Sequence, residues 1–357
     1  MTTPPLDVLV IGAGQAGLAM GQELSRLGRR FEIVDAGAEI GQVWRSRWDS
    51  LRLFTSGRYD SMPGLPFPAA ADAYPGKDDV AAYLRAYAAR FGLPVRLATP
   101  VTSLTRPDGV FIAKAGQEMV EARQVVVATG PFDVPFTPPV AAKLDPEVHQ
   151  IHSVDYRRPD TLRPGTVLVV GAANSGCQIA LELSATRSVE LSAGRRIPTI
   201  PQRPLGRDVW SWGTRLGLDR VTADSRLGRR LAGRDQVIGT GPRQLARRHG
   251  VRLRPKVTDV AGRAVTFADG GAGEYDAVVW ATGFTKDYSW IDIPDVLDQR
   301  GQLRQSRGIT PSPGLYTLGL TWQHTRGSAL LGWVGNDAAY LAEQIESRQR
   351  THHAARS

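Results

Sequence analysis

The sequence contains one cysteine, Cys177, among 357 residues. A single cysteine excludes a disulfide within the chain, a Cys-x-x-Cys redox pair and a metal site built on several thiolates. It therefore excludes the reductases that work through two neighbouring thiols. The one His-x-x-His pair, His149 and His152, has no apparent third ligand and is read as incidental, so we expect no metal ion in this protein.

Long hydrophobic runs are absent as well. No run approaches the roughly 18 apolar residues that a membrane-spanning helix requires, and the stretch Met1–Asp7 carries no basic residue before the first apolar segment. We therefore expect a cytoplasmic protein without a secretion signal and without a membrane partner. No basic helix with interleaved aromatic residues occurs, which argues against a nucleic-acid partner.

Positive charge is present in excess, and it is unevenly placed. The formal net charge is +9, and residues 151–280 alone hold 21 Lys and Arg against 12 Asp and Glu. The rest of the chain is therefore balanced. Such a surplus is either a solvated basic face or an attraction for an anionic ligand or partner.

The chain is organised around residues 6–35. An apolar strand runs into a glycine-rich turn, which is followed by a helical pattern and by a second strand that ends in an acid. This is the G-x-G-x-x-G fingerprint of a dinucleotide site. The first glycine permits the tight turn, the second permits close approach of a pyrophosphate, and the third lets the helix pack on the strand. The terminal acid favours an unphosphorylated ribose, as in FAD or NAD. The candidate binding residues here are Gly12, Gly14, Gln15, Ala16, Gly17 and Asp35.

A second unit of the same kind begins at residue 167. An apolar strand leads into the turn 171–176 and then into a helix that carries Cys177. The strand after that helix is followed by Arg195 and Arg196 rather than by an acid. Arginine at this position suits the 2′-phosphate of NADP, although two solvated arginines on a loop would give the same pattern.

Two apolar strands end in the same tripeptide, Ala-Thr-Gly. Parallel sheets bind ligands at the carboxyl ends of their strands, so Thr129, Gly130, Thr282 and Gly283 are further candidates. The order of the elements predicts an α/β protein with two Rossmann-like domains, the second inserted in the first, as in glutathione-reductase-like folds. We expect an FAD-binding part at 1–155, an inserted NADP-binding domain at 156–280, a completing segment at 281–346 that includes Gly319, and a flexible tail at 347–357. Within the inserted domain, residues 198–241 show the least pattern and suggest a helical insertion or a lid.

A loop rich in tryptophan and arginine, residues 37–55, follows the first unit. Together with GAGQAG, the two Ala-Thr-Gly strands, His152–Tyr156 and VVGAANSG, it makes the chain resemble the class B flavin-dependent monooxygenases, in particular the short bacterial flavin-containing type. The resemblance implies that NADPH reduces FAD and that the reduced flavin reacts with molecular oxygen. The resulting flavin hydroperoxide would oxygenate a small soft nucleophile, namely a sulfide, an amine or in some members a ketone.

The resemblance also implies roles for particular residues. Val43, Trp44 and Arg45 would lie along the ribityl-phosphate arm of FAD. The residues that would contact NADP are Gly171, Asn174, Ser175, Gly176, Cys177 and Gln178, with Arg195 or Arg196 on its phosphate.

The chain departs from the family at two places. The fingerprint F-x-G-x-x-x-H-x-x-x-[YF] is retained only at His152 and Tyr156, with Pro146 and Val148 at its first and third positions. Phe54 stands where many members place an asparagine near the flavin. Phe54 and Tyr156 are the catalytic candidates. Because phenylalanine donates no hydrogen bond, we expect weak stabilisation of the hydroperoxide and some loss of electrons to oxygen.

Two other functions remain open. A ferredoxin or flavodoxin–NADP reductase of the thioredoxin-reductase fold would share both nucleotide units, and the basic middle domain would suit an acidic protein partner. However, such a reductase has no evident use for the loop 37–55, and Gly319 is followed by Leu320 rather than by the aspartate common there. A non-catalytic NADP(H) sensor is the other alternative, and the intact phosphate loops argue against it. The sequence leaves the oligomeric state open, a homodimer included.

Overall fold

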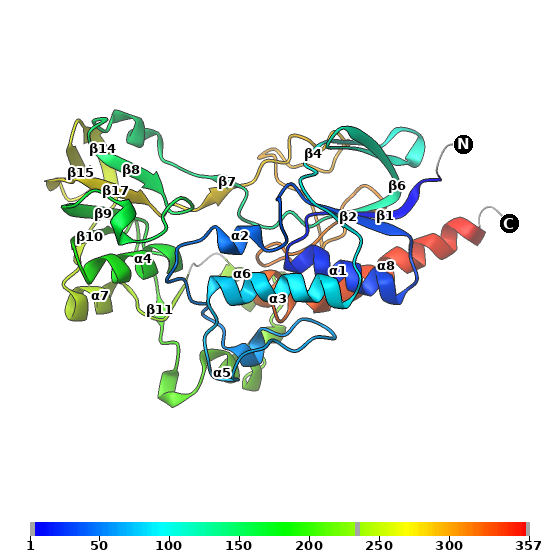
Figure 1. Cartoon of the computed structure of the whole chain (residues 1–357), viewed down its shortest axis with the longest axis horizontal. Coiled ribbons are helices and arrows are strands. Elements are labelled where there is room, and N and C mark those ends of the chain that lie inside the picture. Colours follow the sequence, from blue (N-terminus) through cyan, green and yellow to red (C-terminus); the bar gives the residue numbers. More distant parts are fainter. Residues whose placement is uncertain (1–3, 233–235, 355–357) are drawn as a thin grey trace.

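The computed structural model describes residues 4–232 and 236–354. It has two lobes joined by a narrow ribbon of chain, and both termini lie at the end of the first lobe that is remote from the second (Figure 1). Each lobe is built on a sheet of mainly parallel strands with helices packed beside it. The α/β class predicted from the sequence is confirmed.

The first lobe contains a seven-stranded sheet in the order β3-β2-β1-β6-β5-β4, with β19 pairing to β6. Strands β1, β2, β3, β6 and β19 are parallel, whereas β4, β5 and the first half of β6 form an antiparallel meander. The last four residues of β1 are fully enclosed, which explains their unbroken apolar run. The elements of this lobe are β1 (Leu6–Ile11), α1 (Gln15–Arg26), β2 (Phe31–Val34), α2 (Gln42–Arg45), η1 (Gly57–Tyr59), α3 (Lys77–Arg90), β3 (Val95–Arg96), β4 (Val101–Thr105), η2 (Pro107–Gly109), β5 (Phe111–Ala115), β6 (Glu118–Val127), β19 (Leu315–Thr317), η7 (Arg326–Ala329) and α8 (Val334–Ala354).

The second lobe contains a five-stranded parallel sheet in the order β13-β10-β9-β17-β8, with a small antiparallel sheet, β14-β15-β16, beside it. All its strands lie between β6 and β19 in the sequence, so this lobe is an insertion in the first. Its elements are η3 (Pro139–Lys143), β8 (His149–His152), η4 (Pro159–Thr161), β9 (Thr166–Val170), α4 (Asn174–Ser184), β10 (Ser188–Ser192), α7 (Pro242–His249), β13 (Arg252–Arg254), β14 (Val257–Ala261), β15 (Ala264–Phe267), β16 (Ala272–Glu274) and β17 (Ala277–Trp280).

Two short strands carry the chain between the lobes. β7 (Val134–Pro135) leaves the first lobe and β18 (Phe284–Thr285) returns to it, and the two pair antiparallel between the lobes (Figure 1). The guanidinium of Arg47 lies 5.4 Å from the ring centre of Phe132 and 5.1 Å from that of Phe284. One cation therefore contacts an aromatic ring on each of the two segments that connect the lobes.

The segment 198–241 extends from the second lobe and lies below α3 of the first (Figure 1). It contains β11 (Thr199–Ile200), η5 (Pro204–Gly206), α5 (Val209–Arg215), η6 (Leu218–Arg220), α6 (Arg226–Ala232) and β12 (Val237–Ile238). Residues 233–235 of this segment lie outside the described part. Of the two descriptions that the sequence suggested, the helical insertion matches these elements.

Two element boundaries differ from the sequence-based expectation. β8 pairs with β17 of the second sheet although it precedes the boundary predicted at residue 155. α8 begins at Val334, after the 3₁₀ turn η7. It continues to Ala354, so the stretch predicted as a flexible tail is helical from 347 to 354, while 355–357 lie outside the described residues.

Among the clusters of buried apolar side chains, the largest includes residues of both lobes. Val10 and Met20 of the first lobe belong to it, as do Val169 and Leu183 of the second. Within the described ranges, no helix has the length and apolar composition needed to cross a bilayer.

Candidate functional site

The first glycine turn leaves open space at its middle glycine. Gly12 has φ +110°, and a Cβ there would lie 2.4 Å from the Ala128 carbonyl oxygen; a Cβ on Gly17 would lie 1.8 Å from the Gly12 oxygen. These two glycines are required by the fold itself. Gly14 has an ordinary extended backbone, and a Cβ on it would meet no atom within 4 Å. Its missing side chain therefore leaves room for a ligand rather than for protein.

The helix that follows this turn offers free backbone donors. α1 begins after Gly14, and no side chain caps its N-terminus. The first N–H groups of a helix have no partner within the helix and carry a partial positive charge. An uncapped N-terminus beside open space is suited to a phosphate.

Asp35 holds the turn in place. One carboxylate oxygen accepts a 2.6 Å hydrogen bond from the Ala13 N–H, and the other accepts a 2.7 Å bond from the Gly37 N–H. A carboxylate has about four acceptor positions, so Asp35 can still accept from ribose hydroxyls. The acid thus shapes the loop and faces the ligand space at the same time.

The carboxyl ends of β1, β2 and β6 border one cavity of about 580 Å³. Parallel sheets place ligands at this edge. The predicted residues Gly12, Gly14, Asp35, Val43 and Thr129 all line this cavity, which we call the first cavity. Phe132, Asp133 and Trp290 line it too, although the sequence did not indicate them.

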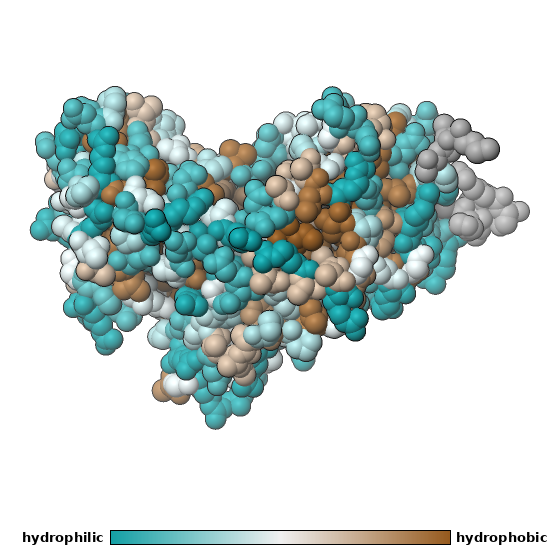
Figure 2. Space-filling view, viewed as in Figure 1, coloured by the Kyte–Doolittle hydropathy of each residue, from teal (hydrophilic) through white to brown (hydrophobic). Residues whose placement is uncertain are grey.

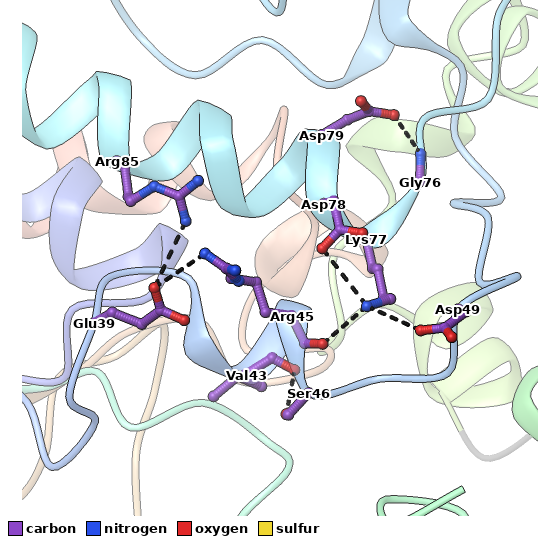
Figure 3. Close-up of polar contacts among 10 residues, drawn as sticks. All are labelled: Glu39, Val43, Arg45, Ser46, Asp49, Gly76, Lys77, Asp78, Asp79 and Arg85. Carbon is purple, nitrogen blue, oxygen red and sulfur yellow. Dashed lines mark hydrogen bonds and ion pairs between the residues drawn. The ribbon is translucent and has the colours of Figure 1, made fainter. Parts of the chain in front are cut away.

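Helix α3 anchors the loop that carries Val43. The Lys77 ammonium donates to the Arg45 carbonyl oxygen at 3.0 Å and pairs with Asp49 at 3.4 Å, and Arg45 pairs with Glu39 at 3.2 Å (Figure 3). Because Lys77 is buried, its bond to the Arg45 carbonyl is shielded from water and fixes the loop, whereas Asp49 is exposed. Val43, 57% exposed, points away from α3 into free space (Figure 3). Arg45 is directed at Glu39, so its guanidinium does not border the cavity.

Other predicted residues tie the start of α1 to its surroundings. Trp44 donates from its indole to the Gln15 side-chain oxygen at 3.3 Å, and the Gln15 amide donates to the Ala329 carbonyl at 3.1 Å. Gly319 has φ +85°, and a Cβ there would lie 2.7 Å from that of Ala16. These residues hold the C-terminal segment against the glycine turn.

The second glycine turn repeats the geometry of the first. Gly171 has φ +107°, and a Cβ there would lie 2.2 Å from the Ala281 oxygen; a Cβ on Gly176 would lie 1.8 Å from the Gly171 oxygen. α4 begins after Ala173 and has no side-chain cap. Its N-terminus is therefore a second place for a phosphate, with a methyl group where the first turn has open space.

A second cavity, of about 330 Å³, lies between the lobes. Leu53 and Phe54 line it from the first lobe, and Asn174, Cys177 and Gln178 line it from the second. The Gln178 amide donates to the Arg52 carbonyl at 3.1 Å and accepts from the Arg52 N–H at 3.3 Å, which joins the lobes. We call this space the inter-lobe cavity.

Cys177 and Asn174 have local structural partners. Burial raises the pKa of the Cys177 thiol to about 12, so it stays protonated and makes no thiolate. Asn174 accepts from the Ile238 N–H at 2.9 Å and donates to the Gln236 carbonyl at 3.4 Å. Because the Cys177 thiol also donates to the Ala172 carbonyl at 3.4 Å, neither side chain can reorient toward a ligand without breaking a bond.

The remaining predicted binding residues lie at strand ends. Arg195 and Arg196 follow β10 at the carboxyl edge of the second sheet, and both are exposed. The Thr282 hydroxyl donates to the Phe136 carbonyl, and the Gly283 carbonyl accepts from the Phe136 N–H at 2.9 Å. The second Ala-Thr-Gly segment therefore anchors the crossing ribbon.

The two catalytic candidates lie in different environments. Tyr156 is fully buried, and its hydroxyl donates to a Glu182 oxygen at 2.7 Å; burial and this neighbour raise its pKa. Its hydroxyl does not line either cavity. Phe54 does line the inter-lobe cavity and stacks on Trp210, with ring centres 6.1 Å apart and planes at 24°.

Aromatic residues from three distant segments meet at Phe54. Trp210 of α5 donates to the Phe54 carbonyl at 3.3 Å and lies 5.1 Å from the Trp333 ring, which stacks on Tyr59 at 5.7 Å. The Arg326 guanidinium lies 5.2 Å from the Trp210 ring, and burial lowers its pKa. The sequence does not reveal this group, because its members lie in separate segments and meet only in the folded chain.

Asp60 was also missed. It is fully buried and accepts from the Thr55 hydroxyl at 2.5 Å, while its second carboxylate oxygen has no partner within the described residues. Burial, and to a lesser degree Asp208, raise its pKa to about 7. Nothing in the local sequence distinguishes it from a surface acid.

No group of three metal-ligating side chains occurs within the described ranges. The groups at the first cavity are instead backbone N–H groups, the Asp35 carboxylate and aromatic walls.

Comparison with known proteins identifies the class. A family model described as pyridine nucleotide-disulphide oxidoreductase matches residues 9–197. An uncharacterized CzcO-like oxidoreductase of Geobacillus kaustophilus is 45% identical over 341 residues, covering 95% of this chain and 98% of that protein. A solved flavin-containing monooxygenase from Stenotrophomonas maltophilia is 29% identical, with a TM-score of 0.80 over 97% of this chain and 99% of that one. Indole-3-pyruvate monooxygenase YUCCA8 of Oryza sativa subsp. indica is 27% identical, covering 97% of this chain and 92% of that protein.

The chain therefore belongs to the pyridine nucleotide-disulphide oxidoreductase family, and within it to the flavin-dependent monooxygenases. It is an oxidoreductase, as the sequence predicted. FAD and NADPH, the predicted cofactors, are those of this class of enzyme. The disulphide in the family name does not describe this chain, whose one cysteine is a buried thiol.

Proposed function

We propose that the protein is an NADPH-dependent monooxygenase that inserts one atom of molecular oxygen into a small soft nucleophile, a sulfide or an amine, with ketones as a further class. The observation that carries this proposal is the pair of uncapped helix N-termini, α1 and α4, each at a glycine turn and each beside a cavity. Two such N-termini fit two dinucleotides, one in each lobe.

The first cavity fits FAD. The open space at Gly14 admits a pyrophosphate, and the backbone N–H groups of Gln15 and Ala16 are free to donate to it. Asp35 suits a ribose with both hydroxyls free. When bound, the reduced flavin supplies the activation of oxygen. Val43 is an apolar, exposed group on this wall, and we propose that it packs along the flavin nucleotide.

The inter-lobe cavity is the place we propose for the nicotinamide end of NADPH. The N-terminus of α4, at Ser175 and Gly176, would hold the pyrophosphate, and Arg195 or Arg196 would pair with the 2′-phosphate. The proposed domains follow from this assignment: an FAD part, an inserted NADP part that ends at residue 280 and a completing segment at 281–346. Because β8 pairs within the second sheet, we propose that the inserted part starts before residue 149.

Phe54 determines how well this site keeps water away. Its ring is half-buried against Trp210 and faces the inter-lobe cavity. A phenyl ring excludes water but offers no donor to a developing negative charge on oxygen. We therefore expect slow NADPH oxidation without substrate, with part of the electrons released as hydrogen peroxide.

The test measures NADPH use and peroxide together. Adding a small sulfide or amine should raise NADPH consumption, lower the peroxide share and yield the sulfoxide or N-oxide. Phe54→Asn, which adds an amide donor, should lengthen the life of the oxygenated species seen in stopped-flow absorbance after oxygen meets the NADPH-reduced enzyme. Phe54→Leu is the control, because it keeps the wall apolar and adds no donor.

The ferredoxin or flavodoxin reductase is the other outcome of this experiment. Direct return to oxidised flavin in both the parent and Phe54→Asn, no oxygenated product from a broad panel of sulfides and amines, and rapid reduction of ferredoxin would establish it in place of the monooxygenase.

A further inference from the structure

The segment 198–241 presents large apolar side chains to solvent. Leu205 is 90% exposed, Leu216 69% and Leu218 45%. Burying such side chains would be favourable, so three of them at one part of a surface indicate a partner. Figure 2 shows hydrophobic atoms reaching the lower edge of the molecule beside hydrophilic ones, where Figure 1 places this segment.

The three leucines belong to one small unit. The Trp212 indole donates to the Pro204 carbonyl at 3.0 Å, which fixes the turn η5 against α5. Leu216 ends α5, and Gly217, with φ +66°, turns the chain directly into η6, where Leu218 is the first residue. The three leucines therefore lie on adjoining turns of one small unit.

The backbone at Leu205 supports a functional reading. Leu205 has φ +53°, a left-handed conformation that is uncommon for a bulky side chain. Such residues persist where the surrounding structure enforces them, and they cluster at functional sites. Here the left-handed conformation belongs to the most exposed of the three leucines.

The charges of this unit are arranged so that the basic ones face outward. Arg207, Arg215 and Arg220 are exposed, and no ion pair involves them within the described residues. Asp208 instead caps α5 by accepting from the Trp210 N–H at 2.8 Å. Asp219 has one oxygen that is buried. The outer face thus combines apolar and positive groups, within the region that carries the chain's whole surplus of charge.

We propose that this unit docks on the surface of an anionic membrane. The docking residues, which we call the tip surface, are Leu205, Arg207, Arg215, Leu216, Leu218 and Arg220. Leucines that enter the headgroup boundary and arginines that pair with lipid phosphates are the two components of peripheral binding. A second copy of this chain fits less well, because two tip surfaces would bring like charges together.

This proposal departs from the expectation of no membrane partner. That expectation concerned spanning segments and secretion signals, whereas exposure of the leucines is a property of the fold. The docked unit also carries Trp210, which stacks on Phe54 at the inter-lobe cavity. Attachment would therefore bring this cavity close to the lipid, without any change in the site itself.

The experiment measures sedimentation of the flavin-loaded protein with vesicles. We expect binding to vesicles of equimolar phosphatidylglycerol and phosphatidylcholine, little binding to phosphatidylcholine alone, and release by salt. Each arginine near an anionic surface contributes about fivefold to partitioning. Arg207→Gln/Arg215→Gln/Arg220→Gln should therefore lower the partition coefficient by about 100-fold.

Matched variants separate the tip surface from net charge. Arg243→Gln/Arg247→Gln/Arg248→Gln on α7 removes the same charge from another exposed face and should change partitioning by less than about fivefold. Leu205→Ser/Leu216→Ser/Leu218→Ser should weaken binding at least about tenfold, because it removes apolar surface that the membrane would bury. Met119→Ser/Leu253→Ser, exposed apolar residues elsewhere, should not change it.

Several outcomes would overturn the proposal. These are no binding of the parent to anionic vesicles, equal loss in both arginine variants, or binding that survives the leucine substitutions. A parent that sediments as a dimer in analytical ultracentrifugation, converted to a monomer by the leucine variant and indifferent to vesicles, would instead show that a second copy covers this surface. If the leucine variant did not fold, the two arginine variants would still decide the question.

Discussion

Asp60 gives a stability prediction that can be worked out from its surroundings. The carboxyl is fully buried beside the Thr55 hydroxyl, with Asp208 from α5 and Tyr83 from α3 as the other titratable neighbours. Burial and the Asp208 charge both disfavour the ionised form and outweigh the Thr55 hydrogen bond, so the pKa rises from 3.8 to about 7. The unfolded chain, in contrast, ionises this group at its ordinary pKa.

The sign follows from the linkage of protons to folding. The pKa of Asp60 is higher in the folded chain than in the unfolded chain. Its contribution to stability is therefore fully present below the pKa of the unfolded chain, and it is lost as the pH rises through the pKa of the folded chain. A shift of about 3 units corresponds to about 4 kcal/mol between those limits. Between about pH 5 and about pH 8 the expected loss is roughly 2–3 kcal/mol.

Asp60→Asn removes this dependence, because the amide stays neutral at every pH and can still accept from Thr55. Urea unfolding of parent and variant should show a stability difference that shifts toward the variant by roughly 2–3 kcal/mol from about pH 5 to about pH 8. Glu121→Gln, at an exposed position on β6, is the control and should show no such shift. A difference between parent and Asp60→Asn that stays constant over this range would refute the reasoning.

Three further predictions test the proposed sites. Gly14→Val should abolish flavin binding, because the side chain would fill space that protein leaves empty; full flavin absorbance in the purified variant would contradict this. Tyr156→Phe should lower the free energy of unfolding by about 1–3 kcal/mol, since it removes the bond from the buried Tyr156 hydroxyl to half-buried Glu182, while kcat changes little. Arg195→Ala/Arg196→Ala should raise KM for NADPH by roughly 10-fold and leave KM for NADH unchanged; equal use of both cofactors by the parent would reduce these arginines to surface charges.

The first nucleotide turn was predictable because its chemistry is local in the sequence. Gly17 is required by its contact with Gly12, and Asp35 bonds to the N–H of Ala13, both within one strand–turn–helix unit, whereas the contact that requires Gly12 is with Ala128 after β6. The same holds for Gly171 and Gly176 in the second unit. A pattern of some thirty residues is enough to specify such a unit.

The surroundings of Tyr156 could not be predicted from the sequence, because the family resemblance identifies the residue but not the side chains that contact it. In the folded chain its hydroxyl faces Glu182, a helical residue that lies far along the sequence, rather than a cavity. The carboxylate partner could have been guessed only from the contact between the two segments.

Residues 198–241 resisted prediction for a different reason. Their side chains do not pack on their own sheet, so no regular period marks a buried face. Trp210 instead packs on Phe54 and Trp333, and Tyr74 donates to Asp208 at 3.1 Å. The packing partners of this segment lie in the other lobe, so its own sequence does not show which of its residues are buried.

The pairing of β19 with β6 has a consequence for synthesis of the chain. Residues Val125–Val127 of β6 pair with β1 on one side and with Leu315–Thr317 on the other. All strands of the second sheet are complete by Trp280, so on the ribosome the inserted lobe can close while one edge of β6 still lacks its neighbour. An unpaired apolar edge is a template for aggregation. In a nascent chain paused after Trp280, the inserted lobe would therefore be complete while the sheet of the first lobe still lacked β19.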